Sequence, residues 1–388
     1  MSDSHSGFQA PQVLSVAWGH FTHDTFSAFV APLLPRLIEK LSLTLTQAGA
    51  LTSVLQLPAI INPFIGYLAD GLSMRLLVIL APALTATLAS LLGSVSSYNA
   101  ALILLLAMGT SVAMFHAPAP AIIARVSGQQ TGKGMGWFMA AGETGRTLGP
   151  LLAVWAIAAL SLEGMWPVML LGWTASALLA WRLRGVQTPP QKQHGLTEIL
   201  PRLSSVFLPL AVLMLLRNIL MVELTTYLPT FLESEGLSLW VAGGALSLLE
   251  AAGIVGALVG GPLSDRLERK WTLSAAILLA AIFTALFLQS QNWLRIPLLL
   301  GIGLTSLAPQ PIFLAIIQDH FPRHRGVANG LYMSVAFLLQ SAALYSVGVL
   351  GDAIGLRAAF WLGTGLSLLA IPVIWLLPNP EKPPAEAA

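Results

Sequence analysis

The chain has few charged residues and no cysteine. Charged residues make up 9% of its 388 residues, whereas an ordinary soluble domain carries about 25%. Hydrophobic residues reach 56%, and the mean hydropathy is +0.77. The absence of cysteine excludes disulfides and thiolate chemistry. The charged residues are too few to cover a surface that faces water. We therefore predict that lipid surrounds most of the chain.

Signals of several other protein classes are also missing. The net charge of +2 is too small to indicate a nucleic-acid partner. No Gly-x-x-x-x-Gly-Lys-Ser/Thr loop indicates nucleotide binding. The segment MSDSHSGFQAPQ lacks the basic region and the small-residue cleavage site of a signal peptide, so we expect the first hydrophobic segment to remain as an anchor.

Long apolar runs dominate what is present. A spanning helix needs about 20 mostly apolar residues. Twelve such runs are bounded by charges or by Gly, Pro, Asn and Ser clusters. They cover residues 11–35, 46–69, 75–95, 99–124, 134–160, 165–183, 203–231, 239–263, 271–290, 294–318, 326–350 and 356–377. The sequence predicts an all-α membrane protein with twelve transmembrane helices.

The loops divide and orient these helices. The polar stretch RGVQTPPQKQHGLTEILPR is the only long one between runs. We predict a six-helix bundle over residues 1–184, a linker over 185–202, a second six-helix bundle over 203–378 and a disordered tail over 379–388. Twelve basic residues lie in loops on the side of the linker and both termini, against four on the other side. The positive-inside rule therefore places the linker and termini in the cytoplasm of a bacterial-type inner membrane.

The two halves repeat one another. GYLADGLSMR (66–75) matches GPLSDRLERK (261–270), aligning Asp70 with Asp265 and Arg75 with Lys270. A similar offset aligns LLLAMGTSVAMFHAPAPAIIAR with LLLGIGLTSLAPQPIFLAIIQD. Two parallel six-helix repeats are the plan of one transporter class, in which the substrate site lies between the halves near the midplane.

The loop at residues 261–270 resembles the signature loop of the major facilitator superfamily. Its pattern in the second half comprises Gly261, Asp265, Arg266, Arg269 and Lys270, whereas the first half keeps only Asp70 and Arg75. The resemblance implies that these residues latch a cytoplasmic gate, with the acid meeting the positive end of a neighbouring helix. The stretches GHFTHD, LSLTLTQAGALTSVLQL, GTSVAMFHAP, GETGRTLGPLLA and GGPLSDRLERK are similar to the fosmidomycin-resistance group of exporters. The first helix of that group carries a pattern similar to His-x-x-Asn-Asp. His20 and Asp24 match this pattern, and His23 stands where the group has asparagine.

A glycine motif favours export. The segment GRTLGP is similar to a Gly-x-x-x-Gly-Pro motif in the fifth helix of proton-coupled antiporters, with Gly145, Gly149 and Pro150 at the matching positions. The glycines allow neighbouring helices to approach closely. Pro150 lacks a backbone donor and favours a kink. The further glycines of that motif are absent, because Leu152 and Ala153 follow.

Ionisable residues inside predicted membrane helices mark the candidate site, because each costs at least about 2.5–3.5 kcal/mol at a helix centre. His20 and Asp24 are four residues apart and share one helical face, with His23 beside it. Histidine titrates near neutral pH, so we predict proton coupling at Asp24, His20 and His23. Glu143 and Glu250 are further candidates. Purely structural roles remain open, above all for His23.

The repeat suggests a division of labour between the halves. Positions 23 and 24 align with Arg217 and Asn218, His116 with Gln310, and Arg146 with Gln340. We predict that the first half carries the proton site and that His116, Arg146, Arg217, Asn218 and Gln310 bind substrate. The two arginines suit an anionic cargo. We expect Glu143 and Arg146 to pair with each other, and Glu223 to lie near an outer helix end in contact with water.

These observations predict a proton-coupled efflux antiporter for a small organic compound, working by alternating access. Its partners would be the bilayer, a small-molecule substrate and protons, with no cofactor beyond the proton gradient, no resident metal and no nucleic acid, and we expect a monomer. Export of metal ions or metal complexes through His20, His23, Asp24 and His116 is an alternative. Uptake by proton symport is another, and a membrane-embedded enzyme is a remote one.

Overall fold

The structure is a computed structural model, and it describes residues 7–61, 74–186, 203–321 and 325–378. Every regular element in these ranges is helical. The α-helices are α1 (Ala10–Ser27), α2 (Val30–Leu41), α3 (Leu45–Gln56), α5 (Met74–Leu91), α6 (Tyr98–His116), α7 (Ala119–Ser127), α8 (Thr131–Leu160), α9 (Leu170–Arg182), α11 (Leu208–Val222), α12 (Leu228–Ser234), α13 (Leu239–Leu267), α14 (Arg269–Gln289), α15 (Arg295–Ser306), α16 (Pro309–His320), α17 (Arg325–Ile354) and α18 (Leu356–Ile374). The prediction of an all-α membrane protein is confirmed.

The membrane crossings follow from these helices. Nine helical stretches in the described residues are long and apolar enough to span a bilayer. One of them, Tyr98–Leu160, makes two crossings because α7 packs back against α8. The α1–α2 pair, and α3 with the following turn Leu57–Ile61, are two further apolar helical segments of the described residues, in keeping with the expected twelve crossings.

Several crossings consist of two helices because proline or a wide turn interrupts them. Pro118 and the proline pair at 309 and 311 lie at the breaks between α6 and α7 and between α15 and α16. Between α11 and α12 the chain forms a π-helical turn, η6 (Glu223–Tyr227), in which hydrogen bonds span one residue more than in an α-helix. Residues beside these interruptions line the central cavity that is described below.

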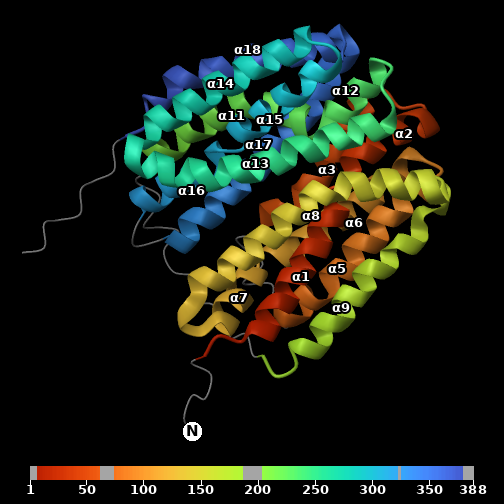
Figure 1. The fold of residues 1–388 in the computed structure, drawn as a ribbon, viewed down its shortest axis with the longest axis vertical. Helices are drawn as coiled ribbons and strands as arrows, with labels where there is room; N and C mark the ends of the chain where they lie inside the picture. The colour runs from red at the N-terminus through yellow and green to blue at the C-terminus, as the bar shows by residue number, and fades with distance from the viewer. Residues whose placement is uncertain (1–6, 62–73, 187–202, 322–324, 379–388) are drawn as a thin grey trace, which may run out of the picture.

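The two halves of the chain form two helical bundles (Figure 1). Helices α1 to α9 make the first half and α11 to α18 the second. The halves meet where α3 packs against α17 and where α8 packs against α13. At one end α2 also packs against α12, whereas α7 and α16 at the other end pack within their own halves. We call the end of the bundle near Val186 and Leu203 the linker end, and the opposite end the far end.

The far end is closed by contacts between the halves. The Asp352 carboxylate, at the end of α17, accepts hydrogen bonds of 2.8 and 2.7 Å from the backbone N–H groups of Leu45 and Thr46 at the start of α3. An ion pair of 2.9 Å joins Arg36 of α2 to Glu233 of α12. Between α3 and α17, the hydroxyl groups of Ser53 and Ser341 each donate a hydrogen bond to the backbone carbonyl of the other residue, at 2.7 and 3.1 Å.

The first half is held together by close contact between α1 and α8. A Cβ atom added at Gly145 would collide with the carbonyl of Phe21, and one at Gly149 would collide with Thr25 and Ala28. Only residues without a side chain allow α8 to lie this close to α1. The glycine motif therefore fixes the wall of the first half that carries His20 and Asp24.

Candidate functional site

A central cavity of about 310 Å³ lies between the two halves. Both halves contribute polar side chains to its wall, and the set includes five of the ionisable residues that the sequence places inside membrane helices. The polar and charged lining residues are Asp24, Ser27, Thr52, Gln56, His116, Arg146, Arg217, Asn218, Thr225, Thr226, Glu250, Gln310 and Gln340.

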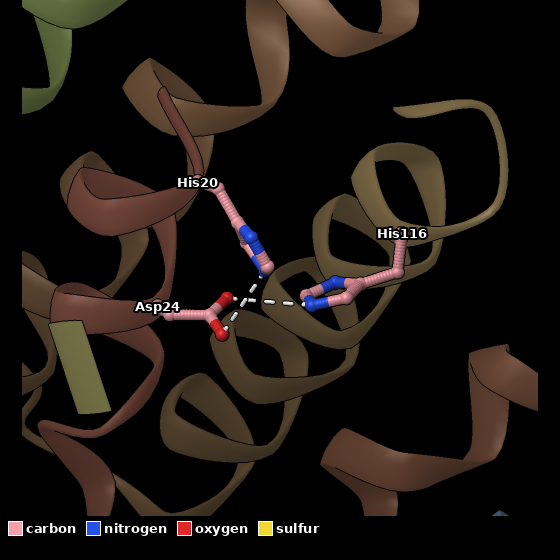
Figure 2. Close-up of side chains that lie close together, drawn as sticks. All are labelled: His20, Asp24 and His116. Carbon is pink, nitrogen blue, oxygen red and sulfur yellow. Dashed lines mark ion pairs between the residues drawn. The ribbon is translucent and has the colours of Figure 1, made fainter. Parts of the chain in front are cut away.

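Asp24 stands between two histidines at this wall (Figure 2). Its Oδ2 atom lies 3.3 Å from Nε2 of His20, one turn earlier in α1. Its Oδ1 atom lies 3.4 Å from Nε2 of His116, the last residue of α6. His20 and Asp24 are buried, whereas the His116 side chain is 33% exposed, so His116 is the member of the cluster most open to the cavity.

The hydrogen bonds of the two imidazoles define where a proton is needed. Nδ1 of His20 lies 2.8 Å from the Phe138 carbonyl, and Nδ1 of His116 lies 3.2 Å from the Val112 carbonyl. A carbonyl only accepts, so both Nδ1 atoms carry hydrogen and donate. Each Nε2 then faces a carboxylate oxygen of Asp24. Two lone pairs repel, so each of these contacts is attractive only when a proton lies between the two atoms. The arrangement is therefore suited to binding protons.

His23 is placed differently from His20. It is fully buried and is absent from the cavity wall. Its Nδ1 atom lies 3.1 Å from the Thr85 hydroxyl, which in turn contacts the Ser111 hydroxyl at 2.8 Å. The ring stacks on Phe115 with 4.6 Å between centroids. These contacts join α1 to α5 and α6 behind the cavity.

Glu143 and Arg146 form an ion pair of 2.5 Å on α8, as the sequence predicts. The Arg146 guanidinium faces the cavity and also interacts electrostatically with Glu250 of α13 and with Asp24. Arg146 therefore lies between acidic groups from both halves. The predicted candidates Asp24, Glu143, Arg146 and Glu250 belong to one charged network across the cavity.

Arg217 is the basic residue that the second half contributes to the cavity wall. It is buried, donates to the Ser306 carbonyl, and lies over the Phe313 ring at 5.5 Å from the centroid. No carboxylate of the described residues forms an ion pair with it. Asn218 and Gln310 line the cavity beside it. The second half thus presents a buried cation and neutral amides, which suits an anionic group.

The predicted gating residues lie at the linker end. Asp70 falls outside the described residues. Arg269 pairs with Asp265 at 3.0 Å and with Asp319 at 2.5 Å. Lys270 donates to the Leu377 carbonyl and Arg75 to the Leu183 carbonyl, while Arg266 is exposed. All of these described contacts stay within one half.

The positions of two acidic residues, Asp352 and Glu223, could not be predicted from the sequence. The contact of Asp352 with the start of α3 has no local signal in the sequence, because the two segments are about 300 residues apart. Glu223, expected near water, is fully buried, and the prediction of a wet position is wrong. Glu223 is the first residue of η6, and the hydrophobic pattern of α11 does not reveal that turn.

Comparison with known proteins identifies the family. The sequence profile of the Major Facilitator Superfamily matches residues 16–344, with a second match over residues 251–388. The chain is 26% identical to the fosmidomycin resistance protein of Escherichia coli K12 over 379 residues, which covers 95% of this chain and 93% of that protein. It is 34% identical to the multidrug efflux pump Tap of Mycobacterium tuberculosis H37Rv over 136 residues, which covers 34% and 30%.

Solved structures share the fold. A bacterial homologue of the human lysosomal transporter Spinster, in an inward-facing and occupied conformation, gives a TM-score of 0.79 at 13% identity and covers 95% of this chain and 97% of that chain. A D-xylose–proton symporter gives a TM-score of 0.77 at 14% identity and covers 96% and 99%. The chain is therefore an integral membrane protein that belongs to the Major Facilitator Superfamily, whose members are transporters and not enzymes.

Proposed function

We propose that this transporter is a proton-coupled antiporter that exports a small anionic organic compound across a bacterial-type inner membrane. The observation that carries the proposal is the Asp24 carboxylate held between His20 and His116 at the wall of a cavity that also contains Arg146 and Arg217. The relatives named for fosmidomycin resistance and multidrug efflux support the direction of transport. The two bundles, the cytoplasmic linker and the monomeric state are part of this proposal.

Proton binding and cargo binding compete through charge. An ionised Asp24 carboxylate accepts a hydrogen bond from an N–H or O–H group of the cargo, while the anionic group of the same molecule lies beside Arg146 and Arg217. A proton on Asp24 occupies this acceptor and weakens cargo binding, so cargo binding releases the proton. The Arg146 guanidinium, which interacts with Asp24, Glu143 and Glu250, transmits this change across the cavity. Unequal binding of cargo to the two protonation states is what couples their fluxes.

Alternating access is supported by the contacts at the far end. Asp352 and the Arg36–Glu233 pair close that end between the halves, whereas the described ion pairs of Arg269 at the linker end stay within the second half. Opening the far end requires these polar contacts to separate, while the loop acids and bases at the linker end, including Asp265 and Arg269, take up gate-latching roles. The excess of basic residues in the loops on that side supports a cytoplasmic linker end.

Purified protein in sealed vesicles tests the proposal. Fosmidomycin is the first probe because of the E. coli relative, followed by other small anions. An imposed pH gradient should drive the probe against the flow of protons, and adding probe without a gradient should release protons. Movement of probe and protons in the same direction would instead indicate a symporter.

Export of a divalent cation is a second candidate, favoured by one observation. One ligand atom from each of His20, Asp24 and His116 lies within 4.8 Å of the others, and the Nδ1 atoms of both histidines are bound to carbonyls, which is how metal-ligating histidines are commonly oriented. Calorimetry with Zn²⁺, Co²⁺ and Ni²⁺ on the full chain decides between the two. Micromolar binding that is lost in His116→Ala and kept in His23→Ala would favour the metal.

A further inference from the structure

We propose that Glu223 is a second proton-binding site of the transport cycle, in which the carboxyl group is neutral and sealed in the present conformation and meets the cavity when the π-helical turn η6 relaxes. The inference rests on the proposed alternation of the two halves, but its tests do not depend on cargo or on proton release at Asp24.

The Glu223 side chain has no access to solvent and no partner. Glu223 is 0% exposed, and both of its carboxyl oxygens lack a hydrogen bond within the described part of the chain. An ionised carboxylate buried without a donor or a cation costs far more than a buried pair, and such groups become neutral instead. The geometry therefore requires a proton on Glu223.

The charged groups on the neighbouring helices are engaged elsewhere. Helices α2, α11, α12 and α13 contact η6, and α18 contacts the carboxyl group itself. None of their described charges pairs with Glu223. The engaged groups are Arg36 and Glu39 with each other, Glu233 with Arg36, Lys40 with Glu163, Arg217 with the Ser306 carbonyl, Glu235 with Arg295 and Arg357, Glu250 with Arg146, Asp265 with Arg269, and the Tyr227 hydroxyl with the Leu344 carbonyl. Arg266, on α13, is exposed at the linker end.

A gap on α18 accommodates the carboxyl group. Gly363 lies directly against it, and a Cβ atom added at Gly363 would overlap Oε2. Any other residue at this position would displace the glutamate. The second half therefore has a fitted space for an uncharged carboxyl group between α11 and α18.

The π-helical turn provides a way to move the group. Asn218, Met221 and Val222 of α11 and Thr225 of η6 line the cavity, and Glu223 is one position beyond Val222. One residue of an α-helix corresponds to a rotation of about 100°. If the π-helical turn changed to regular α-helix, α11 would rotate by about this angle. Glu223 would then lie on the cavity face that Val222 now occupies. Single π-helical turns are uncommon and occur frequently at functional sites.

Infrared spectroscopy of the purified full chain tests the proton. Wild-type protein at neutral pH should show the carbonyl stretch of a buried protonated carboxylic acid, and Glu223→Gln should lack it. Glu235→Gln is the matched control, because Glu235 is held by two arginines and its loss should leave this band intact. Gly363→Ala should shift the band. A band that is unchanged in Glu223→Gln overturns the proposal.

Deuterium exchange tests the movement. In D₂O the band should shift within minutes as the free protein alternates between conformations. The chain has no native cysteine, so Arg36→Cys combined with Glu233→Cys allows a short bis-maleimide to lock the far end. The lock should slow the shift at least tenfold, whereas the crosslinker on Arg36→Cys alone should not. Equal exchange in locked and free protein overturns the proposed exposure of Glu223, whatever the outcome of the transport assays.

Discussion

His116 of α6 faces Asp24 of α1 across the cavity wall, with 3.4 Å between Nε2 and Oδ1. The contact exists because α6 ends at His116, where Pro118 prevents it from continuing. The imidazole is thereby left at a helix end, partly exposed to the cavity, with Nδ1 held by its own helix. It is the one histidine of the cluster that both cavity water and the Asp24 carboxylate can reach.

Replacing His116 should therefore impair coupling more than replacing His23. We expect His116→Gln to lower the initial rate of pH-driven transport at least tenfold, because Asp24 loses the partner through which protons enter. His23→Gln should keep most of the transport rate and lower thermal stability, since a buried polar group left without its partner costs about 1–3 kcal/mol. Transport rates in vesicles and melting curves measure both effects. A His116→Gln protein that transports at the wild-type rate contradicts this role.

Arg217 should determine affinity for the anionic group. A hydrogen bond to a charged group contributes about 1.5–3 kcal/mol, so Arg217→Gln should raise KM for an anionic cargo about 10- to 100-fold with a smaller change in kcat. Arg182→Gln is the control, because Arg182 lies over the exposed Trp181 ring at 4.0 Å and far from the cavity wall. An unchanged KM in Arg217→Gln would rule out a direct contact with cargo.

Asp352 should hold the far end closed. Its carboxylate caps the start of α3, and losing such a cap costs about 0.5–2 kcal/mol, so Asp352→Ala should raise the population open at the far end about 2- to 30-fold. A Thr226→Cys reporter in the cavity, labelled by an impermeant maleimide from the far side, measures that population. Glu39→Ala is the control, since Glu39 only forms an exposed ion pair. Equal labelling in both variants would show that Asp352 does not hold the gate.

Gly142 should be required for the position of His20. A Cβ atom at Gly142 would collide with the His20 imidazole, whereas one at Gly136, in the same helix, meets nothing. Gly142→Ala should lower transport at least tenfold and lower the melting temperature. Gly136→Ala should leave transport unchanged and should not lower the melting temperature, because its Cβ atom meets nothing and alanine favours a helix by roughly 0.5–1 kcal/mol over glycine. Similar effects of the two substitutions would indicate a general effect on helix α8.

The sequence predicts the fold well because long apolar runs, an internal repeat and basic loops are properties of the chain itself. The contact of His20 with Asp24 follows from their spacing of four residues, and that of Glu143 with Arg146 from their spacing of three. Local spacing therefore predicts contacts within one helix.

Contacts between helices could not be predicted in the same way. Nothing local to Asp352 indicates that it caps α3, and nothing near His23 indicates its bond to Thr85. In a helix that is apolar on every side, the hydrophobic pattern does not show which face turns to the cavity. Glu223 shows the same difficulty, because it lies at a π-helical turn that changes the register between α11 and α12.

Proton release on cargo binding tests the central claim most directly. Unbuffered vesicles containing wild-type protein are mixed with fosmidomycin, or with another anion shown to be transported, and the external pH is recorded. The account predicts proton release from the wild type and at least tenfold less from Asp24→Asn, with Glu39→Gln behaving as the wild type. Equal proton release from wild type and Asp24→Asn would contradict the assignment of Asp24 as the coupling site.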